Sequence, residues 1–154
     1  MLQPADAMLH LTHAWEGGCL RKGGDDGRGT RVSQALVVED LRLFREALAI
    51  MLEEQTDLKK TIQTGSLAEA RRVWEHLCDD IDLAVVDIDL KNGDGISLIE
   101  NLREAAPDVP VLALISARSL EQRARALRVG ANEVITMDSS SDQIIDAAKR
   151  LLSG

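Results

Sequence analysis

The sequence predicts an α/β fold, in which five parallel strands form one doubly wound sheet with helices on both faces. Short apolar runs alternate with longer segments whose apolar residues recur every three or four positions, as on one face of a helix. Some of the strand-like runs, such as Val111–Ile115, are apolar throughout, which is typical of parallel strands buried on both sides. At 154 residues, 45% of them hydrophobic, the chain is long enough to bury one core of this kind.

The first two strand–helix units begin at residue 34. The run 35–38 predicts a strand, and the apolar residues after it share one helix face, namely Leu41, Phe44, Leu48, Met51 and Leu52. A weaker strand is expected at 58–64. Ser66 can cap the helix that follows, and the apolar face of that helix comprises Leu67, Ala70, Val73, Trp74 and Leu77.

The next two units repeat the alternation. The runs 83–86 and 111–115 predict the third and fourth strands. Between them lies a helix that ends before Pro107, with an apolar face formed by Ile96, Ile99 and Leu102. The helix at 120–129 ends at Gly130, a residue suited to a helix C-terminus.

The last unit completes the predicted sheet. A short strand is expected at 133–136, and Ser140 with Gln143 predicts a capping box for a helix at 144–152. Right-handed crossovers leave few topologies for five such units, and we expect the flavodoxin-like strand order 2-1-3-4-5. In that order a ligand binds at the carboxyl ends of the strands, beside the switch between strands 1 and 3.

Charge and cysteine usage narrow the classes of function. The formal net charge of −8 argues against a nucleic-acid-binding surface, which needs an excess of lysine and arginine. Cys19 and Cys78 form no CxxC motif and fit a reducing cytosol. No apolar run approaches the ~20 residues of a membrane span, and the N-terminus lacks the basic and apolar pattern of a secretory signal. We therefore expect a cytoplasmic protein with no direct nucleic-acid partner and no membrane contact.

Residues 1–33 differ in composition from the rest of the chain. They hold six of the eleven glycines, mixed with charges and without sustained periodicity. We therefore expect a mobile N-terminal extension at 1–33, followed by one domain at 34–154. His10, His13 and Cys19 do not complete a metal site, because no second cluster supplies the remaining ligands.

Carboxylates follow two of the predicted strands. Glu39 and Asp40 come after the run 35–38, and Asp87 comes after 83–86. These strand ends are neighbours in the expected order, so the three acids repel one another unless a cation lies among them. Oxygen ligands of this kind suit Mg²⁺, which can neutralise an incoming phosphoryl group, and a carboxylate at a strand tip can act as a nucleophile. Taken alone, Asp87 would also fit a helix or turn cap.

Several short motifs occur in order along residues 34–154. They are Val37-Val38-Glu39-Asp40, Asp82-Leu83-Ala84-Val85-Val86-Asp87, Gly93-Asp94-Gly95, Pro107-Asp108-Val109-Pro110-Val111, Ser116-Ala117 and Gly130-Ala131. With these motifs at these intervals, the chain resembles the receiver domain of two-component response regulators, a phosphoprotein module of signal transduction.

The resemblance implies roles for particular residues. Asp87 would be the phosphoacceptor that takes a phosphoryl group from a histidine kinase or phosphotransfer protein. Asp40, Asp87 and the backbone carbonyl of Asp89 would bind Mg²⁺ directly, and Glu39 would act through a bound water. Ser116 would be the switch hydroxyl that bonds a phosphoryl oxygen. Such a domain catalyses at most its own phosphorylation and dephosphorylation, and it would act on an output domain, a partner protein or a second copy of itself.

Three positions depart from the family pattern. Met137 occupies the place of the family's lysine after the last strand, and Val134 occupies the place of its switch aromatic. Lys91 or Asn92 stands where the family has a proline after the phosphoacceptor. A thioether supplies neither the charge nor the hydrogen bonds of a lysine, so the usual readout of phosphorylation is altered here.

Arginines in the second half suggest two further hypotheses, each with a simpler alternative. Arg118 or Lys91 could supply the missing cation, and Arg118 could pair with Asp89 over the pocket mouth; the alternative is a solvated pair that contributes little. The helix at 120–129 carries a positive stripe that could meet an acidic partner or a second copy, or could be a solvated face; the stripe comprises Arg123, Arg125 and Arg128.

Two alternatives to phosphosignalling remain open. A degenerate receiver would bind partners without phosphorylation, as the missing lysine and aromatic suggest, although the retained Asp40, Asp87 and Ser116 favour the phosphorylated module. The run Val86-Asp87-Ile88-Asp89 also resembles the first motif of haloacid-dehalogenase-type phosphatases, but their later lysine and downstream acid pair are not found in that order. The chain ends at Gly154, soon after the last predicted helix, as a stand-alone receiver or a shortened chain would.

Overall fold

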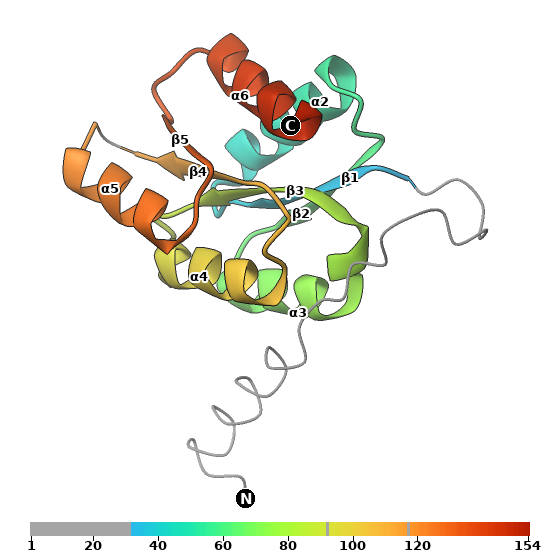
Figure 1. Ribbon diagram of the computed structural model, residues 1–154. Coiled ribbons are helices and arrows are strands. Elements are labelled where there is room, and N and C mark those ends of the chain that lie inside the picture. Colours follow the sequence, from blue (N-terminus) through green and yellow to red (C-terminus); the bar gives the residue numbers. More distant parts are fainter. Residues whose placement is uncertain (1–31, 92, 117) are drawn as a thin grey trace, which may run out of the picture.

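The computed structural model describes residues 32–91, 93–116 and 118–154. The described strands form one parallel sheet in the order β2-β1-β3-β4-β5 (Figure 1). They are β1 Gln34–Val38, β2 Lys60–Thr64, β3 Ile81–Asp87, β4 Val111–Ile115 and β5 Glu133–Thr136. The predicted flavodoxin-like order 2-1-3-4-5 is therefore confirmed. Residues 1–31, which hold most of the expected N-terminal extension together with His10, His13 and Cys19, lie outside the described residues.

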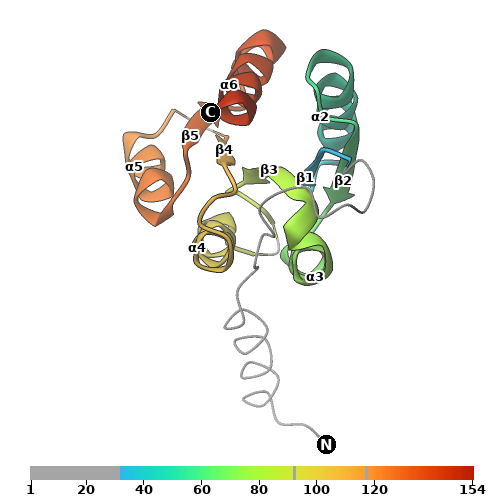
Figure 2. The same ribbon diagram turned by 45° about the vertical axis from the view of Figure 1, so that its right-hand side comes forward.

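Helices follow each of these strands and cover both faces of the sheet. They are α2 Arg42–Gln55, α3 Leu67–Leu77, α4 Gly95–Ala105, α5 Leu120–Val129 and α6 Ser141–Ser153, with a short 3-10 helix, Cys78–Asp80, after α3. Figure 2 shows α2 and α6 on one face and α3, α4 and α5 on the other. Parallel strands joined by helical crossovers produce this three-layer arrangement.

Successive strand residues point to opposite faces, so the sheet separates two apolar cores. Leu36 and Val38 belong to the core beneath α3, α4 and α5, which we call the α3/α4/α5 core and which also contains Trp74, Ile99, Leu102 and Ala126. Ala35 and Val37 belong to the α2/α6 core, which also contains Leu48, Leu52, Ile144 and Ile145. Burial on both faces explains why the central segments 35–38, 83–86 and Val111–Ile115 are apolar at consecutive positions.

Serine caps begin three of the described helices, and the sequence predicts two of these caps, Ser66 and Ser140. Ser66, Ser119 and Ser140 each accept a hydrogen bond from a backbone N–H in the first turn of their helices. Ser140 and Gln143 form the predicted capping box, in which both reciprocal bonds are present. Gly130 ends α5 with a φ of 122°, a backbone conformation that residues with a Cβ rarely adopt.

The second strand is shorter than its apolar pattern suggests. β2 begins at Lys60, although Leu58 is buried. Thr56 Oγ1 accepts a hydrogen bond of 3.1 Å from the Leu58 N–H, so that amide belongs to a turn and not to the sheet. None of the described helices combines the length and the hydrophobicity that crossing a membrane requires.

Candidate functional site

The carboxyl ends of β1 and β3 bring three acidic side chains together. The register pairs Val38 with Val86, so Glu39 and Asp87 leave neighbouring strands at the same level. Carboxylate oxygens of Glu39, Asp40 and Asp87 all lie within 4.8 Å of one another. Glu39 is 0% exposed and Asp87 is 3% exposed, whereas Asp40 is half-buried. The convergence of acids predicted from strand order is therefore present.

Burial and mutual repulsion govern the charge of this cluster. The pKa of Glu39 is raised from an ordinary value of 4.5 to about 8. Burial is the largest cause, the hydrogen bond from Leu41 N–H opposes it, and the negative charge of Asp87 adds to the increase. Burial also raises the pKa of Asp87, partly offset by a 2.9 Å hydrogen bond from Asp89 N–H to Oδ1. Without a cation, burial and the neighbouring acids therefore favour the protonated form of Glu39 at neutral pH.

The donor set fits a hard divalent cation. It consists of oxygen atoms, and Glu39 Oε2 is buried without a hydrogen-bond partner among the described residues. Buried polar atoms are usually satisfied by protein, water or an ion, so this oxygen indicates a missing partner. Asp40 Oδ2 accepts a 2.8 Å hydrogen bond from Lys91 N–H, which fixes this carboxylate beside the other two. Carboxylates arranged in this way can hold Mg²⁺.

Asp89 lies at the edge of the acid cluster and connects three parts of the chain. Its carboxylate accepts hydrogen bonds from Ser116 N at 3.0 Å, from Ser116 Oγ at 2.7 Å and from Gln122 Nε2 at 3.0 Å. Partial burial raises the pKa of Asp89, but these donors outweigh burial and lower the pKa overall. The predicted switch hydroxyl of Ser116 is therefore near the site, with Asp89 as its hydrogen-bond partner.

Gln122 is a site residue that the sequence does not reveal. Ser119 and Gln122 have the spacing of a capping box, in which the glutamine side chain returns to the backbone of the cap. The structure uses half of that pattern: Ser119 Oγ accepts a bond from Gln122 N–H, but the Gln122 side chain bonds Asp89 instead. The capping pattern conceals this contact, because only the fold brings Asp89 beside the start of α5.

The proposed ion pair between Arg118 and Asp89 is wrong. Arg118 Nε lies 3.7 Å from Asp138 Oδ2, and both side chains are more than half exposed. The carboxylate of Asp89 is already occupied by Ser116 and Gln122. Arg118 is thus part of a solvated surface pair, which was the simpler of the two alternatives. Lys91 contributes its backbone N–H to Asp40.

The residues at the end of β5 contribute to packing. Val134 is buried in the α3/α4/α5 core, and the half-buried Met137 packs against the α2/α6 core. These are two of the three positions at which the sequence departs from the receiver pattern. Neither brings a charged group toward the acid cluster, because the side chains of valine and methionine carry none.

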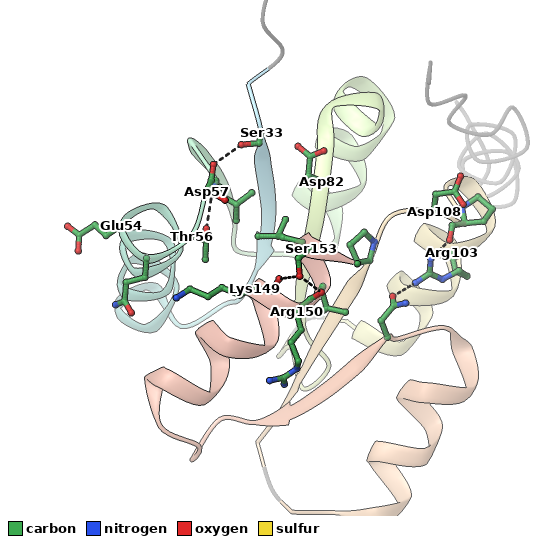
Figure 3. Close-up of a pocket in the computed structure, with 18 residues that line it drawn as sticks. Ser33, Glu54, Thr56, Asp57, Asp82, Arg103, Asp108, Lys149, Arg150 and Ser153 are labelled. Atoms are coloured by element: carbon green, nitrogen blue, oxygen red, sulfur yellow. Dashed lines mark hydrogen bonds between the residues drawn. The ribbon is translucent and has the colours of Figure 1, made fainter. Parts of the chain in front are cut away.

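A cavity of about 1100 Å³ lies at the opposite edge of the sheet (Figure 3). Residues near the amino ends of the strands line it, including Ser33, Leu58, Asp82, Pro110 and Asn132. Arg103, at its rim, donates to the carbonyl oxygens of Gly130 and Val109, so this guanidinium has a structural role. The cavity is therefore separate from the acids at the carboxyl ends of β1 and β3.

Comparisons with known proteins agree with this geometry. The family model of the response regulator receiver domain matches residues 35–149. A glycerol metabolism activator of Pseudomonas putida is 29% identical over 120 residues, which cover 77% of this chain and 53% of that protein. The chain spans about half the length of the curated relatives it matches.

Two solved structures share the fold at lower sequence identity. A receiver domain protein from Clostridium thermocellum has a TM-score of 0.71 at 18% identity, covering 79% of this chain and 95% of that one. A response regulator from Burkholderia pseudomallei, solved with a phosphorylated aspartic acid, a calcium ion and citrate, has a TM-score of 0.65 at 24% identity, covering 79% and 69%. With the family match over 35–149, the chain belongs to the response regulator receiver domain family.

Proposed function

We propose that residues 34–154 act as a receiver domain that accepts a phosphoryl group on Asp87 from a histidine kinase or phosphotransfer protein. Receiver domains of two-component signalling pair with histidine kinases. The observation that carries the proposal is the buried cluster of Glu39, Asp40 and Asp87, whose carboxylate oxygens lie within 4.8 Å at the switch point of the sheet. The phosphorylated aspartic acid and calcium ion of the Burkholderia pseudomallei regulator are consistent with such chemistry on this fold.

Each residue of the cluster would have its own role in binding the cation or in the phosphoryl transfer. Asp40, Asp87 and the backbone carbonyl of Asp89 would hold Mg²⁺, and Glu39 would act through a bound water. When bound, the cation supplies positive charge against the phosphoryl oxygens and lowers the pKa values that burial raises. A carboxylate oxygen of Asp87 attacks the phosphorus atom, the bond from phosphorus to the donor's histidine nitrogen breaks, and an acyl phosphate forms.

The replacement of the family's lysine and aromatic supports one alternative function, a receiver that works without phosphorylation. Met137 and Val134 are packed in the two cores, so the lysine and aromatic of the family have no counterpart there. A receiver that binds partners independently of phosphorylation would tolerate both replacements. The intact acid cluster favours phosphorylation. Buried carboxylates lower the stability of a fold, so a receiver with no use for them would gain stability by losing them. An aspartate-based phosphatase is not retained, since the acid pair directly follows β1, upstream of Asp87.

Acetyl phosphate with Mg²⁺ tests the proposal directly. We expect intact-mass spectrometry to find one added phosphoryl group on the wild-type chain and none on the D87N variant. D108N is the matched control, because Asp108 is an exposed acid at the opposite edge of the sheet and should leave the yield unchanged. Absence of the adduct from the wild type, or its persistence in D87N, would contradict the proposal.

A further inference from the structure

Asp89 ties the acid cluster to helix α5. Its backbone N–H donates to Asp87 Oδ1 at 2.9 Å, and its carboxylate accepts from Ser116 Oγ at 2.7 Å and Gln122 Nε2 at 3.0 Å. Three segments therefore meet on one side chain: the loop after β3, the loop after β4 and the first turn of α5. Bonds to an ionised carboxylate are stronger than those between neutral groups.

The Ser116 hydroxyl can serve only one acceptor at a time. A serine hydroxyl carries a single proton for donation, and in this structure that proton is directed to Asp89. A phosphoryl oxygen on Asp87 would need the same proton. The two hydroxyl bonds exclude each other, so Asp89 must lose the Ser116 hydroxyl whenever a phosphoryl group gains it. Of its two bonds from Ser116 it then keeps only the 3.0 Å bond from the N–H.

We propose that the Asp89 carboxylate is the resting-state competitor for the Ser116 hydroxyl, and that Gln122 transmits the release of this carboxylate to α5. This conformational switch rests on the function proposed above and replaces the missing readout at the end of β5. A phosphoryl group on Asp87 also adds negative charge two residues from Asp89, which favours separation of the two groups.

The packing of α5 makes it responsive to this contact. Ala126 is its one buried residue, whereas α4, also fully described, buries six. The C-terminal end of α5 is held through Gly130, whose carbonyl accepts bonds from Arg103 Nε at 3.1 Å and Nη2 at 2.7 Å. The N-terminal end is held by Gln122 on Asp89. Release of Gln122 therefore frees one end of a thinly packed helix while the other stays fixed.

The surface of α5 provides a route from this release to a partner. Leu120, in its first turn, is 85% exposed, and Leu127 is exposed on the last turn. Arg123, Arg125 and Arg128 are also exposed. A movement of the N-terminal end would thus displace a surface that is both apolar and positively charged, without rearranging either core.

The rate of phosphorylation by acetyl phosphate with Mg²⁺ tests the competition. We expect D89N to react about fivefold faster than the wild type, since the charged competitor for Ser116 is gone. E121Q removes one charge from an exposed neighbour of Gln122 and should change the rate by less than about twofold. In the S116A background, D89N should have little effect. A full fivefold effect in that background would mean that Asp89 acts by charge alone, and would overturn the inference.

The side-chain amide of Gln122 provides a second readout by NMR. We expect its signals to move toward those of a free amide in unmodified D89N, and to move the same way when beryllofluoride and Mg²⁺ bind the wild type. An adduct that leaves these signals unmoved would overturn the switch while the proposed function stands. Failure of both the wild type and D89N to form any adduct would overturn the proposed function and the switch together.

Discussion

The carboxyl ends of β3 and β5 lie at the same edge of the sheet but carry different side chains. At the end of β3, Asp87 belongs to the acid cluster, in which Glu39 Oε2 is buried without a hydrogen-bond partner among the described residues. Within and just after β5, Val134 is buried in the α3/α4/α5 core and Met137 packs against the α2/α6 core. The difference indicates that the chemistry of the pocket and its readout are separable. The pocket keeps its reactive groups, and the connection to the surface passes through Asp89, Ser116 and Gln122 instead.

The largest effect on stability is expected from two lysine substitutions in and after β5, which test how deeply each position is packed. V134K buries a charge in the α3/α4/α5 core, and we expect it to lower the free energy of unfolding by about 3 kcal/mol or more. M137K should cost about 1 kcal/mol, because a half-buried lysine can extend its ammonium group to water. Urea unfolding measures both. Equal losses would mean that Met137 is as deeply embedded as Val134.

Without divalent cations, the acid cluster should make the free energy of unfolding depend on pH. In the folded chain the pKa of Glu39 is raised from 4.5 to about 8, so the folded state binds more protons than the unfolded state between these values. The free energy of unfolding in EDTA should therefore be greatest at low pH within this window and fall by up to about 1 kcal/mol per pH unit as pH rises from 4.5 to 8.

Two controls accompany this measurement. E39Q should flatten the decline, because the neutral amide binds no proton in either state. Saturating Mg²⁺ should flatten it in the wild type, since the cation favours the ionised carboxylates. A decline that E39Q leaves intact would assign the titration to another group.

The smallest effect is expected at Arg118. Its contact with Asp138 is long and exposed, so R118A should change the free energy of unfolding by less than about 0.5 kcal/mol. The yield of the Asp87 adduct should also stay within about twofold of the wild type. A large loss of adduct in R118A would restore this arginine as the substitute for the family's lysine, and so would place a readout near β5 after all.

The sequence predicts the fold and the acid cluster because both follow from local patterns. Apolar strand runs determine the sheet, and strand order alone places Glu39 and Asp40 beside Asp87. The partners of exposed long side chains do not follow in this way. Arg118 lies beside Asp138 and not beside the expected Asp89, and Gln122 satisfies a capping pattern while its side chain bonds elsewhere. Such contacts depend on loop conformation, which local spacing does not specify.

A crystal structure of the chain with Mg²⁺ and beryllofluoride tests the central claim most directly. We expect the beryllium on a carboxylate oxygen of Asp87, the metal among Asp40, Asp87 and the Asp89 carbonyl, and Ser116 Oγ turned from Asp89 to a fluoride. Beryllofluoride absent from Asp87 would contradict the proposed function. An adduct on Asp87 with Ser116 still bonded to Asp89 would contradict the proposed switch.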